Sequence, residues 1–199
     1  ASHGAALKGV LKADMENIRA TLEKINPYTF EDVLNSIFEA KNIYIIGLRS
    51  STALAEFLGF YLNIILQNVR IVSYGISDIF EQMINIGEGD LVIGIGFPRY
   101  ATKTIDVLDF SKARGAKVVA ITDSLLSPLA AKADSTLIAQ SNMASFVDSL
   151  VAPLSVINAL IIAVGMREKE NIADIFANLE NIWQEYNVYS YNNRNVADD

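Results

Sequence analysis

The stretch that decides the fold is Asp90-Leu-Val-Ile-Gly-Ile-Gly-Phe-Pro-Arg-Tyr-Ala-Thr-Lys-Thr104. Residues 91–95 form a short apolar run without charge between Asp90 and Gly96, a pattern typical of a parallel strand covered on both faces. Beyond the turn, apolar side chains return at helical spacing from Ile105 onward. The stretch therefore predicts a buried strand that ends at Gly96, a short turn and a helix.

Polar side chains gather in this turn and at the start of the predicted helix. Arg99 supplies positive charge, and Tyr100, Thr102 and Thr104 supply hydroxyl groups. The first backbone N–H groups of a helix have no internal partner and carry partial positive charge, so a phosphate can accept hydrogen bonds from them. Residues 96–104 are therefore a candidate anion site. An ordinary strand-to-helix turn with a solvated arginine explains the same residues equally well.

A second turn of the same kind follows residues 43–46, the first predicted strand. It has the sequence Gly47-Leu-Arg-Ser-Ser-Thr52 and leads into a predicted helix. Gly47 permits a sharp turn of the backbone, and Arg49 supplies charge. The short hydroxyl groups are those of Ser50, Ser51 and Thr52. The dinucleotide fingerprint GxGxxG does not follow this strand, which argues against a dinucleotide site.

Short apolar strands and helices alternate through the middle of the chain. Further strands are predicted over 69–72, 117–122 and 134–139, and helices over 77–86, over 104–114 and in a short segment capped by Ser127. This alternation predicts an α/β fold whose parallel sheet carries helices on both faces. Ligands of such sheets bind beyond the carboxyl ends of the strands, where the strand order reverses. The two polar turns both leave that edge.

Helices are also predicted on either side of this alternating region. They cover residues 7–24, a segment capped by Thr29, residues 145–166 and residues 168–186. The chain is predicted to end in a loop or frayed tail over residues 187–199. The first two helices either pack on the core or connect it to another domain and provide a dimer face. The third is apolar almost all round, so we expect it to be buried against a second subunit.

We divide the chain into an N-terminal helical connector (1–42), a core domain (43–166) and a C-terminal helix with its tail (167–199). With 199 residues and 51% hydrophobic content, the chain can bury one full core. Its net charge of -7 argues against a DNA-binding face or attachment to an anionic membrane, so any anion must be bound locally.

The composition also limits the chemistry. The chain has no cysteine and one histidine, His3, which leaves little material for a metal site or a histidine-centred catalytic group. We therefore expect neither a metal nor a cofactor. No apolar run is long enough to cross a bilayer, so we expect a cytoplasmic protein without a membrane partner.

A resemblance to a known family rests above all on Gly115-Ala-Lys-Val-Val-Ala-Ile-Thr-Asp-Ser-Leu-Leu-Ser-Pro-Leu-Ala-Ala-Lys-Ala-Asp134. With residues 43–52 and 90–96, this element resembles the sugar isomerase (SIS) domain, and most closely the C-terminal effector domain of RpiR/MurR-type transcriptional regulators. The resemblance implies a three-layer, doubly wound, five-stranded parallel sheet of flavodoxin-like type. It also implies a homodimer or tetramer, and a phosphosugar effector held by serines and threonines of the turns after the first and third strands. Finally, it implies a regulator of sugar metabolism whose N-terminal helix-turn-helix domain, outside this sequence, binds DNA.

Both polar turns depart from the family pattern. Many SIS domains have Ser-x-Ser-Gly-x-Thr after the middle strand, whereas this chain has Gly96-Phe-Pro-Arg-Tyr-Ala101, and Gly-x-Gly-x-Ser appears as Gly47-Leu-Arg-Ser-Ser51. Arg99 can compensate for the lost hydroxyls because a guanidinium binds phosphate through two parallel hydrogen bonds. The candidate ligand-binding residues are Gly47, Arg49, Ser50, Ser51, Thr52, Gly96, Arg99, Tyr100, Thr102 and Thr104. A changed ligand and a lost ligand both fit these departures.

A phosphosugar aldose-ketose isomerase is the main alternative. Such an enzyme moves a proton between adjacent carbons and needs a base near the sugar. The candidate glutamates fall on predicted solvent-facing surfaces, and they are Glu56, Glu81 and Glu88. SIS enzymes often carry their base just before the long helix, but residues 140–145 contain no acid or histidine, and Asp123 is assigned a structural role in its loop. We therefore name no catalytic residue and predict a sensing domain, with a module that only dimerises as a third alternative.

Overall fold

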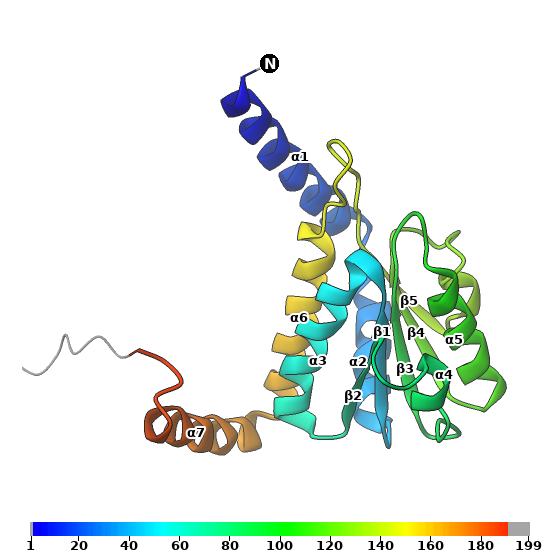
Figure 1. Cartoon of the computed structure of the whole chain (residues 1–199), viewed down its shortest axis with the longest axis vertical. Coiled ribbons are helices and arrows are strands. Elements are labelled where there is room, and N and C mark those ends of the chain that lie inside the picture. The colour runs from blue at the N-terminus through cyan, green and yellow to red at the C-terminus, as the bar shows by residue number, and fades with distance from the viewer. Residues whose placement is uncertain (1, 191–199) are drawn as a thin grey trace, which may run out of the picture.

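The computed structural model describes residues 2–190, and in that range five parallel strands form one sheet (Figure 1). The strands are β1 (Ile43–Gly47), β2 (Val69–Val72), β3 (Leu91–Ile95), β4 (Lys117–Thr122) and β5 (Ser135–Ile138). Their order in the sheet is β2-β1-β3-β4-β5. The predicted doubly wound, five-stranded parallel sheet is thereby confirmed. The predicted tail over 187–199 lies mostly outside the described residues.

Helices cover both faces of the sheet and complete the three layers (Figure 1). One face carries α2 (Pro27–Glu39), α3 (Thr52–Leu66) and α6 (Val151–Arg167), and the other carries α4 (Ile79–Gln82) and α5 (Thr102–Ala113). Strand β1 is buried along its whole length, because Ile43 and Ile45 join the core on the α3 side while Tyr44 and Ile46 join the core on the α5 side. An uncharged strand of this kind can be stable only between two helical layers.

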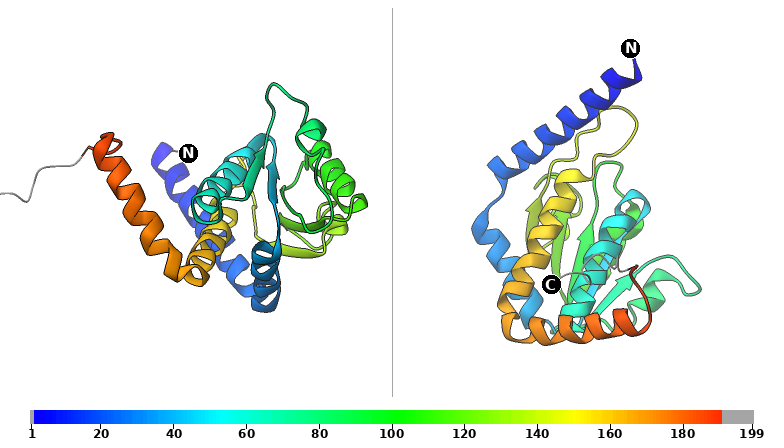
Figure 2. Two further views of the ribbon diagram at one scale, coloured as in Figure 1. Left: turned by 90° about the horizontal axis from the view of Figure 1, so that it is seen from below. Right: turned by 90° about the vertical axis from the view of Figure 1, so that its left-hand side faces the viewer.

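Two further helices lie outside these layers (Figures 1 and 2). Helix α1 (His3–Lys24) packs against α6 and extends beyond the carboxyl end of the sheet, and α7 (Lys169–Glu185) crosses the far end of α6. The buried residues of α1 are Asn17 and Thr21, and α7 has none. In the described part of the chain, no single helix is long and apolar enough to cross a membrane; α6 and α7 reach that length only as a pair bent by 104°.

The predicted start of the long apolar helix at Ser145 is wrong, since α6 begins at Val151. Pro153 explains the difference. Proline lacks the N–H that an interior helical residue donates, and it is tolerated only in the first turn of a helix. A helix that began at Ser145 would place Pro153 in its third turn. Residues 139–150 instead form a loop, and an early helical hydrogen bond of α6 runs from the Leu154 N–H to the Leu150 carbonyl, at 2.9 Å.

The predicted cap of the second helix is also wrong. Helix α2 is capped by Asn26, whose Oδ1 accepts from the Tyr28 N–H at 2.9 Å, and Pro27 takes the first helical position. Proline suits that position because its missing N–H would have no partner there. Helix α5 begins at Thr102, two residues before the predicted start at Thr104.

Two short helices are shorter than predicted. The segment over 77–86 contains only the single-turn α4, closed by a capping box between Asp78 and Glu81. Beyond it, the Ile84 and Ile86 carbonyls accept from Arg114 instead of continuing a helix. The helix expected after Ser127 is a 3-10 turn, η2 (Ala130–Lys132), because the chain must enter β5 immediately afterwards.

Candidate functional site

The carboxyl ends of β1 and β3 lie side by side where the strand order reverses. Strand β1 pairs with β2 on one side and with β3 on the other. Gly47 and Ile95, the last residues of β1 and β3, are partners in the register. The two polar turns therefore leave the sheet at the same level. This reversal point is where doubly wound sheets bind their ligands.

A cavity of about 380 Å³ opens between the two turns. Its walls come from the turn after β1, from the turn after β3 and from the loop before α6. The lining residues are Leu48, Arg49, Ser50, Ser51, Ile95, Gly96, Phe97, Pro98, Arg99, Ala101 and Asp148. Of the predicted site residues, the structure thus brings together Arg49, Ser50, Ser51, Gly96 and Arg99.

The other predicted site residues do not line this cavity. Thr52 and Thr102 are the first residues of α3 and α5. Gly47 lies directly below its turn, where an added Cβ would stand 2.6 Å from the Ser51 carbonyl oxygen. The turn can fold back this closely only because position 47 lacks a side chain. Gly47 therefore shapes the cavity wall without forming part of it.

Thr104 is buried beneath the start of α5. Its side chain is 1% exposed, and Oγ1 has no hydrogen-bond partner among the described residues. A buried hydroxyl without a partner lowers stability relative to an apolar group of the same shape. In this arrangement the hydroxyl is in neither the cavity nor a protein hydrogen-bond network.

Tyr100 connects the turn after β3 to the loop after β4. Its Oη donates to Asp123 Oδ1 at 2.6 Å. Burial, and then the hydrogen bond to Asp123, raise the pKa of Tyr100 above its ordinary value, because both disfavour the phenolate beside a carboxylate. The phenol therefore remains a donor at neutral pH, and Asp123 takes up a structural role between two turns, as predicted.

Arg49 and Arg99 both have left-handed backbone conformations, with φ of 55° and 62°. The other described non-glycine residues with positive φ, Gln67 and Asn187, follow helix ends, where this conformation is common. The two arginines are instead at the walls of a cavity, and strained residues of this kind cluster at ligand sites. Across residues 2–190, neither guanidinium forms an ion pair or a hydrogen bond.

The helices after both turns start without a side-chain cap. No side chain accepts from the first N–H groups of η1 (Arg49–Ser51), α3 or α5. By contrast, Ser2, Asn26 and Asp78 cap α1, α2 and α4. Two cavity-lining residues, Ser51 and Ala101, are the N-cap residues of α3 and α5. The cavity therefore combines two guanidinium groups with the partial positive charge of two uncapped helix starts.

Asp148 is a cavity residue that sequence reasoning missed. The sequence predicts a helix that begins at Ser145 and includes Asp148, and the segment in which SIS enzymes often carry their base, residues 140–145, contains no acid. The structure places it, partly buried, in the loop before α6, where its carboxylate has no hydrogen-bond or ion-pair partner among the described residues. Pro153 is the signal that would have found it, because a proline in the first helical turn leaves residue 148 in the loop.

These features define a class: a doubly wound α/β domain with an arginine-lined cavity at the reversal of its strand order. The SIS domain family matches residues 36–163 of the chain. The chain therefore belongs to the SIS domain family, which confirms the resemblance drawn from its sequence.

Two solved structures show the same fold. The sugar isomerase domain of an RpiR transcription factor from Sphaerobacter thermophilus is 30% identical, with a TM-score of 0.82 over 86% of this chain and 96% of that one. The NanR protein of Vibrio vulnificus, complexed with ManNAc-6P, is 16% identical, with a TM-score of 0.75 over 88% of this chain and 67% of NanR.

Two curated relatives belong to different functional classes. An HTH-type transcriptional regulator of Caldanaerobacter subterraneus is 23% identical over 95% of this chain and 67% of the regulator. An isomerizing glutamine–fructose-6-phosphate aminotransferase of Pyrobaculum aerophilum is 29% identical over 60% of this chain. The chain spans 19% of the length of that aminotransferase.

Proposed function

We propose that this chain is a phosphosugar-sensing and oligomerisation domain of an RpiR-type transcriptional regulator of sugar metabolism. The observation that carries the proposal is the pair Arg49 and Arg99, two guanidiniums that have no hydrogen-bond or ion-pair partner within residues 2–190 and that line one cavity beside uncapped helix starts. A phosphate monoester carries up to two negative charges and accepts several hydrogen bonds at once, so it matches this combination of donors.

The remaining cavity residues suit the sugar part of such a ligand. Ser50 and Ser51 can exchange hydrogen bonds with hydroxyl groups, and the Asp148 carboxylate can accept from them. The volume of about 380 Å³ lies within the range of small-molecule sites. The sugar phosphate in the NanR complex, at the level of shared fold, supports the same ligand class.

We also assign a second copy of this chain as a partner. Apolar side chains on the outer surfaces of α1 and α6 remain exposed: Met15 by 69%, Leu22 by 74%, Ile162 by 63% and Met166 by 71%. Large apolar side chains that remain exposed in this number are typical of a protein interface. Burial of these residues in a homodimer fits the predicted dimer face, and a tetramer would need a further contact surface.

DNA binding, in this proposal, belongs to a helix-turn-helix domain outside the present sequence. The HTH-type regulator, of which this chain spans 67%, and the RpiR transcription factor support that assignment. The net charge of -7 argues against DNA binding by this chain itself, and in this proposal the regulator acts in the cytoplasm.

Isomerisation remains the second candidate function, and Asp148 is the observation that favours it. A carboxylate in the cavity without a protein partner can accept a proton from a carbon or hydroxyl group of a bound sugar. The isomerizing aminotransferase shows that the family includes enzymes. The sensing function needs the same residue only as a hydrogen-bond acceptor.

The test is the thermal stability of the chain with a panel of sugar phosphates, their parent sugars and inorganic phosphate. Binding to the folded state raises the Tm in proportion to the logarithm of ligand concentration. We expect a shift with a sugar phosphate and none with its parent sugar, and we expect Arg49→Ala and Arg99→Ala to abolish it. Arg70→Ala is the matched control, since Arg70 is an exposed arginine on β2 outside the cavity. No shift across the panel would contradict the sensing function.

NMR spectra of the stabilising sugar phosphate separate the two candidates. An unchanged ligand after long incubation supports sensing. Conversion by the wild-type chain that Asp148→Asn abolishes would assign an isomerase with Asp148 as its base.

A further inference from the structure

Helix α1 is attached to the domain through polar side chains rather than through its apolar stripe. Its buried residues are Asn17 and Thr21, which are 2% and 6% exposed. By contrast, Leu11 is 55% exposed and Leu22 is 74% exposed. Hydrogen bonds need defined partners and directions, whereas apolar packing tolerates sliding. The position of α1 therefore depends on the partners of these polar residues.

Those partners all lie in one segment, residues 140–149 of the loop between β5 and α6. Asn17 engages both backbone groups of Asn142: Nδ2 donates to its carbonyl at 2.9 Å, and Oδ1 accepts from its N–H at 3.1 Å. Thr21 Oγ1 accepts from the Gln140 N–H at 2.9 Å and donates to the Asn17 carbonyl at 2.8 Å. These bonds hold the first part of the loop against α1.

The second part of the loop is held by a separate contact. Ser149 Oγ donates to Asp14 Oδ1 at 2.7 Å. Asp14, Asn17 and Thr21 are spaced by three and four residues, so they share one face of α1. We call this set the α1 clasp. Figures 1 and 2 show the loop running beside α1.

The α1 clasp ends one residue away from the cavity. Ser149 is the neighbour of Asp148, and Asp148 is the one contribution of this loop to the cavity wall. No hydrogen bond or ion pair of its own holds the Asp148 side chain among the described residues. The backbone at residue 148 therefore sets the position of this side chain in the cavity, and the hydrogen bonds of the α1 clasp hold the backbone of the loop.

We propose that Asp14, Asn17 and Thr21 are positioning residues of the cavity, which hold residues 140–149 so that Asp148 faces a bound sugar phosphate. Through these contacts, the packing of α1 against the loop is coupled to ligand binding. The proposal rests on the proposed function for the identity of the ligand. Coupling is reciprocal: if α1 bound to the loop raises the affinity for a ligand, the ligand stabilises the contact between α1 and the loop by the same factor. The α1 clasp thus gives ligand binding a direct effect on the first helix of this sequence.

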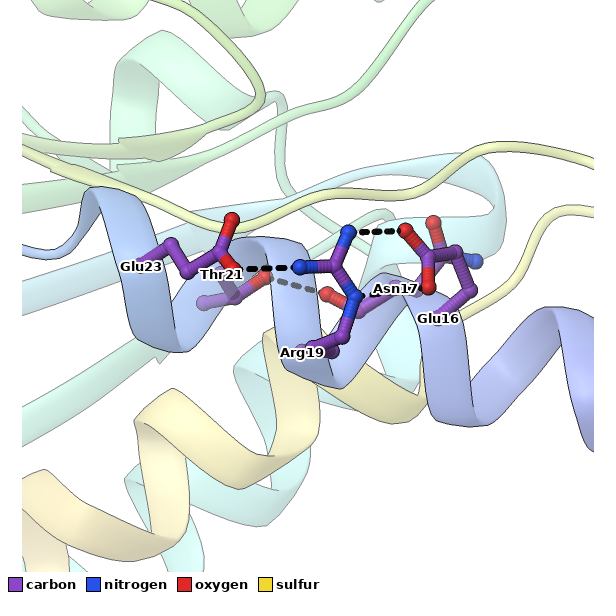
Figure 3. Close-up of polar contacts among 5 residues, drawn as sticks. All are labelled: Glu16, Asn17, Arg19, Thr21 and Glu23. Atoms are coloured by element: carbon purple, nitrogen blue, oxygen red, sulfur yellow. Dashed lines mark hydrogen bonds and ion pairs between the residues drawn. The ribbon is translucent and has the colours of Figure 1, made fainter.

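The opposite face of α1 provides the control. Arg19 forms ion pairs with Glu16 and Glu23 on the exposed face (Figure 3), and within residues 2–190 none of the three forms a hydrogen bond or ion pair with the loop. The same figure shows the hydrogen bond that joins Thr21 to Asn17 along the helix. Arg19→Ala therefore removes polar contacts of the same helix turn and leaves the α1 clasp intact.

The first experiment needs no ligand. The chain has no cysteine, so Asp148→Cys introduces a single thiol in the cavity wall. Its rate of alkylation by iodoacetamide is compared with and without Asn17→Ala. The loss of two hydrogen bonds to the loop backbone should raise that rate by about tenfold. Arg19→Ala should leave it within about twofold.

A second pair of variants separates positioning from general destabilisation. Thr21→Val removes the hydroxyl at constant volume, and Thr21→Ser keeps it. Only Thr21→Val should speed alkylation, together with amide exchange over 140–149. Exchange in β1 and β3 should remain slow in both variants, which verifies that the domain stays folded. Equal alkylation rates in the Asn17→Ala, Thr21→Val and Arg19→Ala backgrounds would overturn the proposal.

Ligand binding provides the last measurement, with inorganic phosphate and the stabilising sugar phosphate of the panel as probes and Asp148 unaltered. The arginines bind both probes, whereas Asp148 contacts only the sugar. Asn17→Ala should therefore weaken binding of the sugar phosphate by about tenfold and leave binding of phosphate unchanged. Equal losses for both probes would contradict positioning through Asp148. If the wild-type chain binds no sugar phosphate, the proposed function fails, while the alkylation rates still decide whether α1 positions residue 148.

Discussion

Arg49 and Arg99 lie in the turns after two adjacent parallel strands, and both have a left-handed backbone, with φ of 55° and 62°. Arg49 lies two residues beyond Gly47, and Arg99 lies three residues beyond Gly96. Both arginines line the same cavity. Two arginines with strained backbone at one site indicate that their side chains have a function at that site.

Glycine at position 99 should stabilise the fold while removing the anion site. A left-handed conformation costs a non-glycine residue roughly 1–2 kcal/mol, and the greater freedom of glycine in the unfolded chain offsets part of that gain. We expect Arg99→Gly to raise the free energy of unfolding by about 0.5–1 kcal/mol, and Arg99→Ala to change it by less than about 0.5 kcal/mol. Urea denaturation measures both. A loss of stability in Arg99→Gly would show that the guanidinium has a structural role.

Replacing Thr104 by valine should not destabilise the chain. Its buried Oγ1 has no hydrogen-bond partner in the described part of the chain, so an isosteric methyl group removes an unsatisfied polar atom. We expect Thr104→Val to leave the free energy of unfolding unchanged or to raise it by up to about 1 kcal/mol. Thr104→Ser, which loses the methyl group instead, should lower it by about 1 kcal/mol. Thermal denaturation compares the two. Thr104 was predicted as a ligand residue, and a lower ligand affinity in Thr104→Val with Thr104→Ser unaffected would support that role.

An alanine at position 47 should distort the first turn. Its Cβ would stand 2.6 Å from the Ser51 carbonyl oxygen and 3.2 Å from the Ala55 Cβ, so the backbone itself must shift. We expect Gly47→Ala to lower the free energy of unfolding by about 1–3 kcal/mol and to weaken binding of a sugar phosphate, because it displaces Ser50 and Ser51. Gly75→Ala is the control, since nothing lies within 4 Å of its added Cβ. Equal stability of the two variants would show that the turn adapts.

The phenol of Tyr100 should ionise above the ordinary pKa of tyrosine. Burial and the hydrogen bond to Asp123 raise its pKa in the folded state above the value of about 10 in the unfolded chain. This stabilisation is fully present below that pH and is lost as the pH rises through the folded-state pKa. The stability difference between wild type and Tyr100→Phe should therefore be constant up to about pH 10 and shrink above it.

Absorbance of tyrosinate near pH 10 and above provides the direct measurement. Tyr100→Phe should remove a component that titrates above the ordinary pKa of tyrosine. A difference between wild type and Tyr100→Phe that is confined to the ordinary range near pH 10 would contradict the raised pKa of Tyr100.

Much of the fold was predictable because its strands are short apolar runs that end at glycines or polar turns. The runs at 43–46 and 91–95 need two helical layers, and the alternation of strands with helices needs parallel pairing. The part of the candidate site on the two turns could also be predicted from the sequence, because the carboxyl ends of neighbouring parallel strands lie at the same edge of the sheet. The start of α6 was missed because apolar periodicity outweighed the one residue, Pro153, that limits a helix.

The sequence by itself determined the sheet, its helical layers and the polar character of the turns that carry Arg49 and Arg99, since these follow from local patterns and from the chirality of parallel connections. Only the tertiary structure decided that Asp148 completes the cavity and that Asn17 and Asp14 hold the loop on which it stands. Those contacts join residues 125 and 135 positions apart in the chain. No local pattern encodes them, because a loop that makes few hydrogen bonds of its own takes its shape from the surface on which it packs.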